Sequence, residues 1–595
     1  MSNSSISDSE ISDPDKLTEK RKTDFLSWVP LAAAILFFLA KLLIISPEGD
    51  FPLNDDYSYG LSVRHFLETG DIKLFASCSG CFVQIALGAM ATSFTGFSFE
   101  VLRDINLCFG FATVIALFLI LRELNLDRSV SGLIAFLWTV NPIATNLEFS
   151  FMTDTMATTF IAFHIFFFLK ALNQDSKCFY LFSAILLSLA VLSRQSSLIF
   201  IAATASIFVF KFWKNRKIQP FVMATIFLPL AAAIVSENLI QQCSLMLESY
   251  NYHKDSFKLF LFSFLSSPLA SSKVLLLQLS IVGAYLGLFS LPLLLGIKYK
   301  FDKTLLKPNL YTAGGLLIGT GFIYKFVLND IRMPALKNIW NLTELGASSL
   351  MGQVSSISEE TKLLVTAGAG FGLLLLAYNL LTLSTVKSEG RSLAPLYCSI
   401  LLALTLGFTA INTSIRGFDR YLLDVYLPAL VCLGLSLKNS DNRVSMIPAI
   451  VLISVMGTLT IAQQTEYMNW NRARWQAIAK LKESGVQPDR IDGGAEYSLY
   501  KKVDYWKDFE IGVGGKHFAP LDLRGREPAN RFRWWPVLGD DYVISLEPIE
   551  GYRVFDSIPF STFGKKEKDK ILILEHDPKG KGESIKNDRS PHSSP

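Results

Sequence analysis

Two adjacent carboxylates, Asp55 and Asp56, stand among aromatic residues in the segment FPLNDDYSYG, just after the first long apolar run. Adjacent carboxylates repel each other, so we expect one of them to be neutralised by a proton or by a cationic partner. Such a group can act as a general base towards a hydroxyl or can hold a metal ion. The alternative is a structural role, because Asp at the start of a helix accepts hydrogen bonds from backbone N–H groups.

Four more charged residues lie at the edges of apolar runs: Asp154, Arg194, Arg416 and Arg420. Asp154 can cap a helix or can join an acidic cluster. Charges at membrane depth are costly and are usually paired or functional. A guanidinium suits phosphate because it donates two parallel hydrogen bonds. The alternative for Arg416 and Arg420 is pairing with a neighbouring carboxylate, Asp419 or Asp424, or contact with lipid head groups.

Other chemistry has little support in the sequence. The motifs for nucleotide hydrolysis, serine esterases and zinc proteases do not occur. The seven cysteines are scattered except for Cys78 and Cys81 in CSGC, which are incidental thiols or a local disulfide. No cluster of His and Cys completes a metal site, so no cofactor is predicted and a divalent metal is left open. The net charge of +4 indicates no nucleic-acid partner.

The elements that position these residues are apolar helices. The chain has 595 residues, 50% of them hydrophobic and 18% charged, with a mean hydropathy of +0.35, whereas about a quarter of a typical soluble chain is charged. Because about 20 apolar residues cross a bilayer, the sequence predicts about thirteen spans. The predicted spans are residues 28–46, 101–122, 131–149, 155–172, 179–193, 195–211, 220–239, 273–297, 309–328, 363–385, 395–413, 421–437 and 445–463. The short apolar segment 81–97 predicts an interfacial or re-entrant helix.

Charge placement predicts which ends of the spans face the cytoplasm. With a cytoplasmic N-terminus, the cytoplasmic loops are short and basic, as the positive-inside rule requires; they are RELNLDR, KALNQDSK, KFWKNRK, KYKFDKTLLK, VKSEGR and KNSDNR. The extracytoplasmic segments are then residues 47–100, 150–154, 240–272, 329–362, the stretch NTSIRGFDR and everything after about 464. Asp154 and the three arginines therefore share the predicted outer side with the acidic pair.

The predicted domains follow from these spans. Residues 1–27 are a cytoplasmic disordered tail, 28–463 a membrane domain with a first outer loop at 47–100, and 577–595 a second disordered tail. Residues 464–576 have mixed composition and predict a small extracytoplasmic α/β domain. In it MNWNRARWQAIAKLKESGV predicts a helix that ends at a Gly. DYVISLEPIEGYRVFDSI predicts two strands around a Pro/Gly turn.

Several segments together resemble a known family. They are PLNDDYSYGLSVRHFLETGDIKL, GFSFEVLRDINLCFG, NPIATNLEFSFMTDTMATTF, LAVLSRQSSLI, DRYLLDVYLPAL and ARWQAIAKLKESGVQPDRIDGG. Their order and sidedness resemble the C-type glycosyltransferases, in particular glycosyltransferase family 39, which includes dolichyl-phosphate-mannose-protein mannosyltransferases, and the bacterial aminoarabinose-transferase-like proteins. The resemblance covers residues 25–215 and 395–560 best.

The resemblance implies an α-helical polytopic membrane protein with the C-type fold, in the cell (inner) membrane. It implies transfer of a sugar from a polyprenyl-phosphate donor to a lipid, glycan or protein acceptor on the extracytoplasmic face. Asp55 or Asp56 then corresponds to the base, and Asp154 to a helper that orients acceptor or donor. Arg420 is the best match for a residue that binds the carrier phosphate, followed by Arg194 and Arg416. Tyr59 is a further substrate-binding candidate.

Three other functions fit parts of the pattern. A glycan ligase or polymerase also uses lipid carriers, and a lipid-linked-sugar transporter or flippase would need no catalysis. Transporters tend to place ionisable groups at the midplane in repeated halves, whereas here the unusual charges gather at one face. A sensor with the C-terminal domain as receptor is the third. The enzyme interpretation requires the acidic pair, Asp154, Arg194 and Arg420 to meet in one outward cavity.

Overall fold

The computed structural model describes residues 25–75, 80–215, 220–245, 247–300, 310–336, 338–342, 345–346, 350, 357–385, 393–439, 442–502, 539–562 and 568–577. Cys78 and nearly all of both predicted tails lie outside these ranges. The chain forms two compact units. Unit 1 comprises Met1–Asp50, Ser58–Gly346 and Ile357–Gln464, and unit 2 comprises Phe51–Tyr57, Ala347–Ser356 and Thr465–Pro595.

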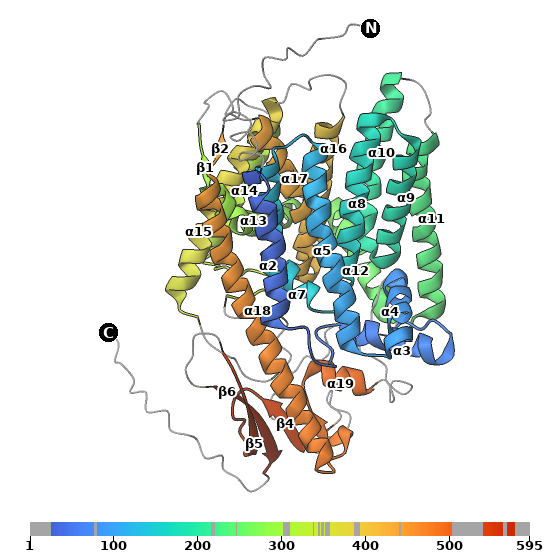
Figure 1. Ribbon diagram of the computed structural model, residues 1–595, viewed down its shortest axis with the longest axis vertical. Helices are drawn as coiled ribbons and strands as arrows, with labels where there is room; N and C mark the ends of the chain where they lie inside the picture. The colour runs from blue at the N-terminus through green and yellow to red at the C-terminus, as the bar shows by residue number, and fades with distance from the viewer. Residues whose placement is uncertain are drawn as a thin grey trace, which may run out of the picture. The chain divides into compact units, whose positions relative to one another are not determined.

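Unit 1 consists of apolar helices that pack side by side (Figure 1). The described helices in chain order are α2 (Val29–Ile45), α3 (Asp56–Thr69), α4 (Phe82–Thr95), α5 (Phe99–Glu123), α6 (Arg128–Thr139), α7 (Pro142–Glu148), α8 (Thr153–Gln174), α9 (Lys177–Ser193), α10 (Leu198–Asn215), α11 (Pro220–Cys243), α12 (Leu247–Ser266), α13 (Pro268–Leu295), α14 (Leu310–Phe322), α15 (Glu359–Leu381), α16 (Ala394–Arg416), α17 (Leu423–Asn439) and the first part of α18 (Met446–Glu483). The 3-10 segments η2 (Gln195–Ser197) and η6 (Asp419–Leu422) precede α10 and α17. Strands β1 (Ile297–Lys298) and β2 (Arg443–Val444) form a short antiparallel pair.

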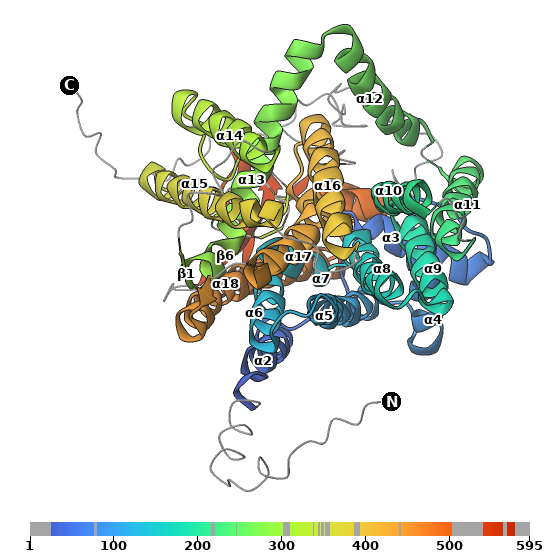
Figure 2. The same ribbon diagram turned by 90° about the horizontal axis from the view of Figure 1, so that it is seen from above.

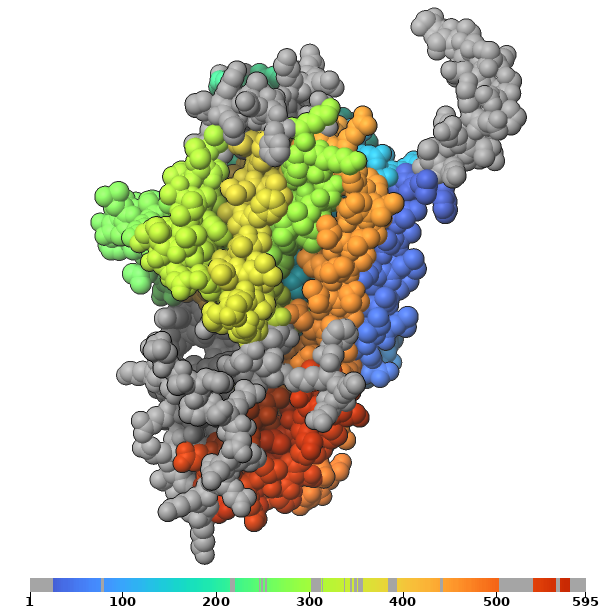
Figure 3. Space-filling view, turned by 90° about the vertical axis from the view of Figure 1, so that its left-hand side faces the viewer, coloured from blue at the N-terminus to red at the C-terminus, as the bar shows by residue number. Residues whose placement is uncertain are grey.

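The helices fall into two groups with α16 and α17 between them (Figure 2). Helices α5, α8, α9, α10 and α11 lie on one side, and α13, α14 and α15 lie on the other. One outer face is formed by α14, α15 and α18 (Figure 3). Large apolar side chains of these three helices are exposed, among them Leu316, Leu364, Leu374, Val451 and Leu459. Exposed apolar side chains along whole helices are expected where lipid replaces water as the solvent.

The predicted spans coincide with helices. In the described part of the chain, nine helices are long and apolar enough to cross a membrane, or up to ten with the pair α6–α7. Three shorter apolar helices, α2, α9 and the segment Gly314–Leu328, account for the remaining predicted spans. A fourth, α4, occupies the predicted interfacial segment 81–97. The predicted class, a polytopic helical membrane protein, is confirmed, and the number of spans stays a prediction.

The span predicted at 131–149 is not one straight helix. Helices α6 and α7 are bent by 64° at a short break, because Pro142 disfavours a helical conformation in the residue before it. The Lys41 ammonium donates at 3.0 Å to the carbonyl of Thr139, the last residue of α6. Lys41 also contacts the Glu148 carboxylate at 2.5 Å, and both side chains are buried. Lys41 of α2 therefore contacts both sides of the bend.

The segment 240–272, predicted as an extracytoplasmic connection between two spans, is mostly helical. Helix α11 reaches Cys243, and α12 follows after three residues. Figure 2 shows α12 running outside the bundle from α11 to α13. The sequence did not predict this helix, because polar residues early in α12 interrupt its apolar pattern, and the extracytoplasmic position of the segment stays a prediction.

Two helices of unit 1 meet through glycines. A Cβ atom at Gly287 on α13 would stand 2.6 Å from the carbonyl carbon of Gly372 on α15, closer than real contacts allow. We expect Gly287→Ala to force the helices apart and to cost about 1–3 kcal/mol, seen as a lower unfolding midpoint in detergent. The control is Gly407→Ala on α16, where a Cβ would meet nothing within 4 Å and where Ala favours the helix by about 1 kcal/mol. Equal midpoints for the two variants would contradict the close approach.

Unit 2 contains the second part of α18, helix α19 (Ala495–Lys502) and a four-stranded sheet. The strands are β3 (Ile491–Asp492), β4 (Tyr542–Ser545), β5 (Tyr552–Phe560) and β6 (Asp569–His576), in the order β3-β4-β6-β5. The two strands predicted at 541–558 are present, but β6 lies between them. The predicted helix at 468–486 is the continuation of α18 and not a separate helix. The predicted α/β character is confirmed.

Candidate active site

An ionic cluster forms in unit 1 where α8 begins and α9 ends. Asp154 lies in the first turn of α8. Arg194 follows α9 with an extended backbone (φ −159°, ψ 124°), which turns its side chain out of the helical path. The Arg194 guanidinium contacts the Asp154 carboxylate at 2.5 Å, and the two side chains are 11% and 3% exposed. The guanidinium also donates to the hydroxyls of Thr153 at 3.4 Å and Ser196 at 3.0 Å.

Three guanidiniums surround the ring of Tyr421, a buried residue of η6. The distances from the ring centroid are 5.3 Å for Arg194, 5.8 Å for Arg416 and 5.8 Å for Arg420. Arg416 also donates to the Tyr421 hydroxyl at 2.6 Å. Each cation gains from the face of the ring, but the three like charges repel one another. An anion bound among them would relieve this repulsion.

Two carboxylates close to these arginines have different surroundings. Asp419 accepts backbone N–H groups of Ile339 at 2.9 Å and Trp340 at 2.7 Å, so it fixes the segment before α15. It also interacts electrostatically with Arg420, as predicted for one alternative. Asp424, in the first turn of α17, is buried and interacts electrostatically with Arg194. Both acids therefore offset part of the positive charge of the cluster.

The acidic pair belongs to unit 2. Asp56 opens α3, and its Oδ1 accepts the backbone N–H of Leu53 at 2.5 Å. This bond closes a tight turn before α3; the carboxylate reaches back to an upstream N–H, as the acid of a capping box does. Asp56 is only 1% exposed, whereas Asp55 is half-buried. Tyr59 is buried in the first turns of α3 and belongs to unit 1.

The predicted site residues thus form two sets. Unit 1 brings Asp154 together with the three arginines, and the acidic pair lies in the other unit. The meeting of both sets in one cavity, and a substrate contact of Tyr59, stay predictions. Sequence reasoning missed Tyr421 as the centre of the arginine cluster. The position of Tyr421 directly after Arg420 could have suggested this role. The approach of Arg194, which follows α9, could not be predicted from the sequence.

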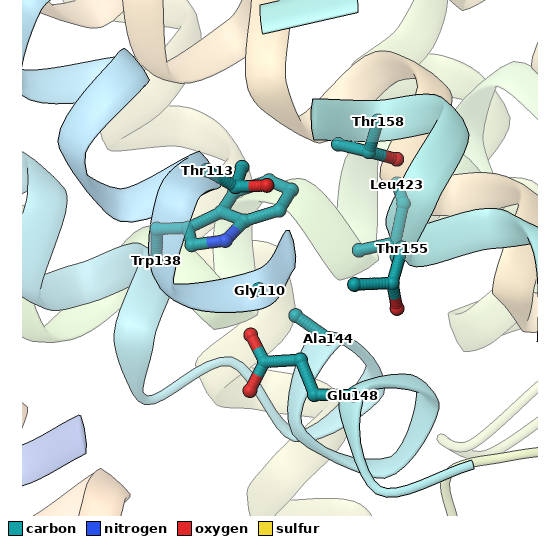
Figure 4. A pocket seen from close by; sticks show the side chains of 8 residues that line it. All are labelled: Gly110, Thr113, Trp138, Ala144, Glu148, Thr155, Thr158 and Leu423. Carbon is teal, nitrogen blue, oxygen red and sulfur yellow. The ribbon is translucent and has the colours of Figure 1, made fainter. Parts of the chain in front are cut away.

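A small pocket lies beside the ionic cluster. Figure 4 shows Trp138 and Thr113 on one side, Thr155, Thr158 and Leu423 on the other, and Glu148 with Ala144 below. Thr155 and Leu423 are the chain neighbours of Asp154 and Asp424. In the described part of the chain, the Trp138 indole N–H and the Thr155 hydroxyl are buried without a hydrogen-bond partner. The cavity has about the volume of one water molecule, which could bind to both groups.

No group of three or more His, Cys, Asp and Glu side chains that could hold a metal ion occurs within the described ranges. Cys81 is buried, and Cys78 lies outside the described residues, so a disulfide between them stays a prediction.

Comparison with known proteins gives one family match. Residues 82–240, a little over a quarter of the chain, match the family described as dolichyl-phosphate-mannose-protein mannosyltransferase. This range contains Asp154 and Arg194 but neither the acidic pair nor Arg420. A search of curated protein sequences finds no match.

Three solved structures are similar in outline. The oligosaccharyltransferase of Archaeoglobus fulgidus has 12% identity and a TM-score of 0.43, over 83% of this chain and 61% of that one. ArnT from Cupriavidus metallidurans has 10% identity and a TM-score of 0.37, over 93% and 98%. The protein O-mannosyltransferase complex of S. cerevisiae has 16% identity and a TM-score of 0.29, over 38% and 33%. The chain spans about three fifths of the archaeal enzyme.

TM-scores below 0.5 do not establish a shared fold, so the family match carries the comparison. It covers the segments around Asp154 and Arg194 that suggested the resemblance. With residues 82–240 matching this family, the predicted resemblance to the C-type glycosyltransferases of glycosyltransferase family 39 is confirmed.

Proposed function

We propose that this protein is a membrane glycosyltransferase that moves a sugar from a polyprenyl-phosphate carrier to an acceptor hydroxyl. The observation that carries the proposal is the arrangement of Arg194, Arg416 and Arg420 around Tyr421 at the ends of membrane helices. Guanidiniums bind phosphate oxygens strongly and in defined directions. The family description, which names a dolichyl-phosphate sugar, supports a phosphate-linked carrier of this kind.

The proposed reaction is a displacement at the anomeric carbon of the sugar. The acceptor oxygen attacks this carbon, and the bond between the carbon and the phosphate oxygen breaks. The electron pair of that bond leaves with the polyprenyl phosphate, whose developing negative charge the guanidiniums stabilise. The acceptor proton moves to a carboxylate acting as general base.

We assign the base to Asp55 and a positioning role to its neighbour. Asp56 is almost fully buried, and one of its oxygens is held by the Leu53 N–H. Asp55 has the more accessible side chain of the two. A base must reach the proton that it removes, which favours the accessible carboxylate. Asp154 holds Arg194 at 2.5 Å and therefore orients one of the phosphate-binding groups.

The direction of insertion completes the proposal. The short basic loops support a cytoplasmic N-terminus, with the ionic cluster and unit 2 on the extracytoplasmic side. A carrier with a long polyprenyl chain reaches such a site from the lipid. The acceptor is a lipid, a glycan or a protein with a free hydroxyl.

The test is label transfer in membranes that contain the protein. Membranes are incubated with a radiolabelled polyprenyl-phosphate sugar and candidate acceptors, and the product is separated from the donor. Transfer from this donor, with none from the corresponding nucleotide sugar after the membranes are washed free of carrier, is the expected result. Label that stays on the carrier with lipid, glycan and protein acceptors alike would contradict the proposal.

The arginines give a sharper prediction in the same assay. Removing one phosphate-binding guanidinium loses charge-assisted hydrogen bonds of about 1.5–3 kcal/mol, so Arg420→Met should lower kcat/KM for the donor by about 10- to 100-fold. Arg420→Lys should recover only part of this, because Lys lacks the planar fork. Arg443→Met, at an exposed arginine of β2, is the control. A loss confined to the acceptor KM would show that Arg420 does not bind the phosphate.

A further inference from the structure

The backbone around the acidic pair has an unusual conformation. Asn54, directly before the pair, has a positive φ of 54°. This left-handed region is uncommon for residues other than Gly, although Asn tolerates it better than most. Such conformations persist only where surrounding contacts fix them, and they concentrate at functional sites. Something must therefore hold this turn.

The contact that holds it comes from a buried ion pair in the same unit. Glu496, on α19, accepts the Asn54 backbone N–H through Oε1 at 3.3 Å. Its other oxygen accepts from Arg474 of α18 at 2.8 Å. The side chains of Arg474 and Glu496 are 0% and 3% exposed. One carboxylate thus joins the turn to two helices of unit 2.

The ion pair is itself well fixed. Arg474 Nε donates to the carbonyl of Gly493 at 2.7 Å. A Cβ at Gly493 would stand 2.7 Å from the Tyr497 ring, so only Gly allows the carbonyl to lie there. Next to the arginine, Trp475 stacks on Phe51 with ring centroids 6.2 Å apart. The loop from Phe51 to Asp56 is therefore fixed at its start by the contact of Phe51 with Trp475 and in its middle by the hydrogen bond of Asn54 to Glu496.

Stability alone is a weak reason for such a pair. Burying two charges costs several kcal/mol per ion, and their attraction often does no more than offset that cost. A role in fixing one conformation explains why the charges are nevertheless placed against a strained turn. Asn54 has the left-handed conformation and also donates its N–H to Glu496. Asn54 is the residue immediately before Asp55.

We propose that Arg474 and Glu496 are positioning residues that set the direction of the acidic pair, so that the C-terminal unit orients the base for the acceptor hydroxyl. The inference rests on the proposed function, since it concerns the same acidic pair. Displacing a reacting group by about 1 Å can cost on the order of 10²-fold in rate. In this proposal the two residues act through Asn54 and not by contact with the substrate.

The first test combines exchange and kinetics. In Glu496→Ala, the peptide that contains residues 51–57 should exchange its amide hydrogens faster than in the wild type. The kcat for sugar transfer should fall by about 10- to 100-fold, while the KM for the donor stays unchanged. The control is Glu575→Gln in the sheet of the same unit, where the hydrogen bond from Arg553 lowers the pKa of the glutamate and where no bond to the loop is involved. Its exchange and kcat should match the wild type.

A second variant keeps the test valid if Glu496→Ala does not fold. The double variant Arg474→Met with Glu496→Gln removes both charges, but the Gln carbonyl can still accept the Asn54 N–H. It should keep most of the kcat and the slow exchange of the 51–57 peptide, whereas Arg474→Met alone should lose both. A double variant with slow exchange and a lost kcat would overturn the positioning role.

The outcomes also separate this inference from the proposed function. If the wild type transfers sugar and Asp55→Asn does not, the proposed function stands. Unchanged exchange and kcat in Glu496→Ala would then overturn the positioning role alone. If the wild type transfers no sugar but Glu496→Ala still speeds exchange at residues 51–57, the contact is real and the proposed reaction is wrong.

Discussion

The Asp55→Asn variant is expected to lose transfer by about 10²- to 10⁴-fold, which is the usual contribution of a general base. Asn has the shape of Asp but cannot take the acceptor proton. The half-buried position of Asp55 makes it the reachable carboxylate of the pair. The loss should appear in kcat, measured by label transfer at saturating donor, while donor binding is retained.

Asp56 supplies the matched comparison. Asp56→Asn keeps an oxygen that can accept the Leu53 N–H, the bond that closes the turn at 2.5 Å. We therefore expect a much smaller loss than for Asp55→Asn, and a larger one for Asp56→Ala, which breaks the turn. If Asp56→Asn is the inactive variant, the roles of the two acids are exchanged. If both Asn variants transfer as well as the wild type, the acidic pair is not catalytic.

The helices were predictable because runs of about 20 apolar residues carry their own signal. Their interruptions were harder to predict. The polar stretch at Arg194 was long enough to mark the end of α9. The single Asn-Pro at 141–142 also signals a break, but the apolar residues around it concealed the bend between α6 and α7. Lys41, which contacts both sides of the bend, lies about 100 residues earlier.

The candidate site was only half predictable for a similar reason. Charged residues at the ends of apolar runs are visible in sequence, and this identified Asp154 and the arginines. Tyr421 is the centre of the arginine cluster because Arg194, after α9, and Arg416, at the end of α16, lie against its ring. Glu496 lies more than 400 residues from Asn54, and no periodicity or motif links them. Contacts between distant segments depend on packing that local patterns do not encode.

The ion pair of Arg194 and Asp154 allows stability and function to be separated. Arg194→Met leaves a carboxylate that is 3% exposed without its partner at 2.5 Å. Breaking a buried pair in this way costs about 3–5 kcal/mol. We expect a large drop in the free energy of unfolding, measured by denaturant titration in detergent. Asp154→Asn should cost less, because Asp424 still interacts with the guanidinium.

The double variant Arg194→Met with Asp154→Asn removes both charges. It should be more stable than the sum of the single effects implies, with a coupling of about 1–3 kcal/mol. Its transfer activity should stay as low as that of Arg194→Met, since neither new side chain can bind the carrier phosphate. If the double variant recovers stability but does not transfer sugar, the ion pair contributes to folding and Arg194 is also needed for the reaction. Single effects that add to within about 0.5 kcal/mol would contradict the coupling, and recovered transfer would remove Arg194 from the phosphate site.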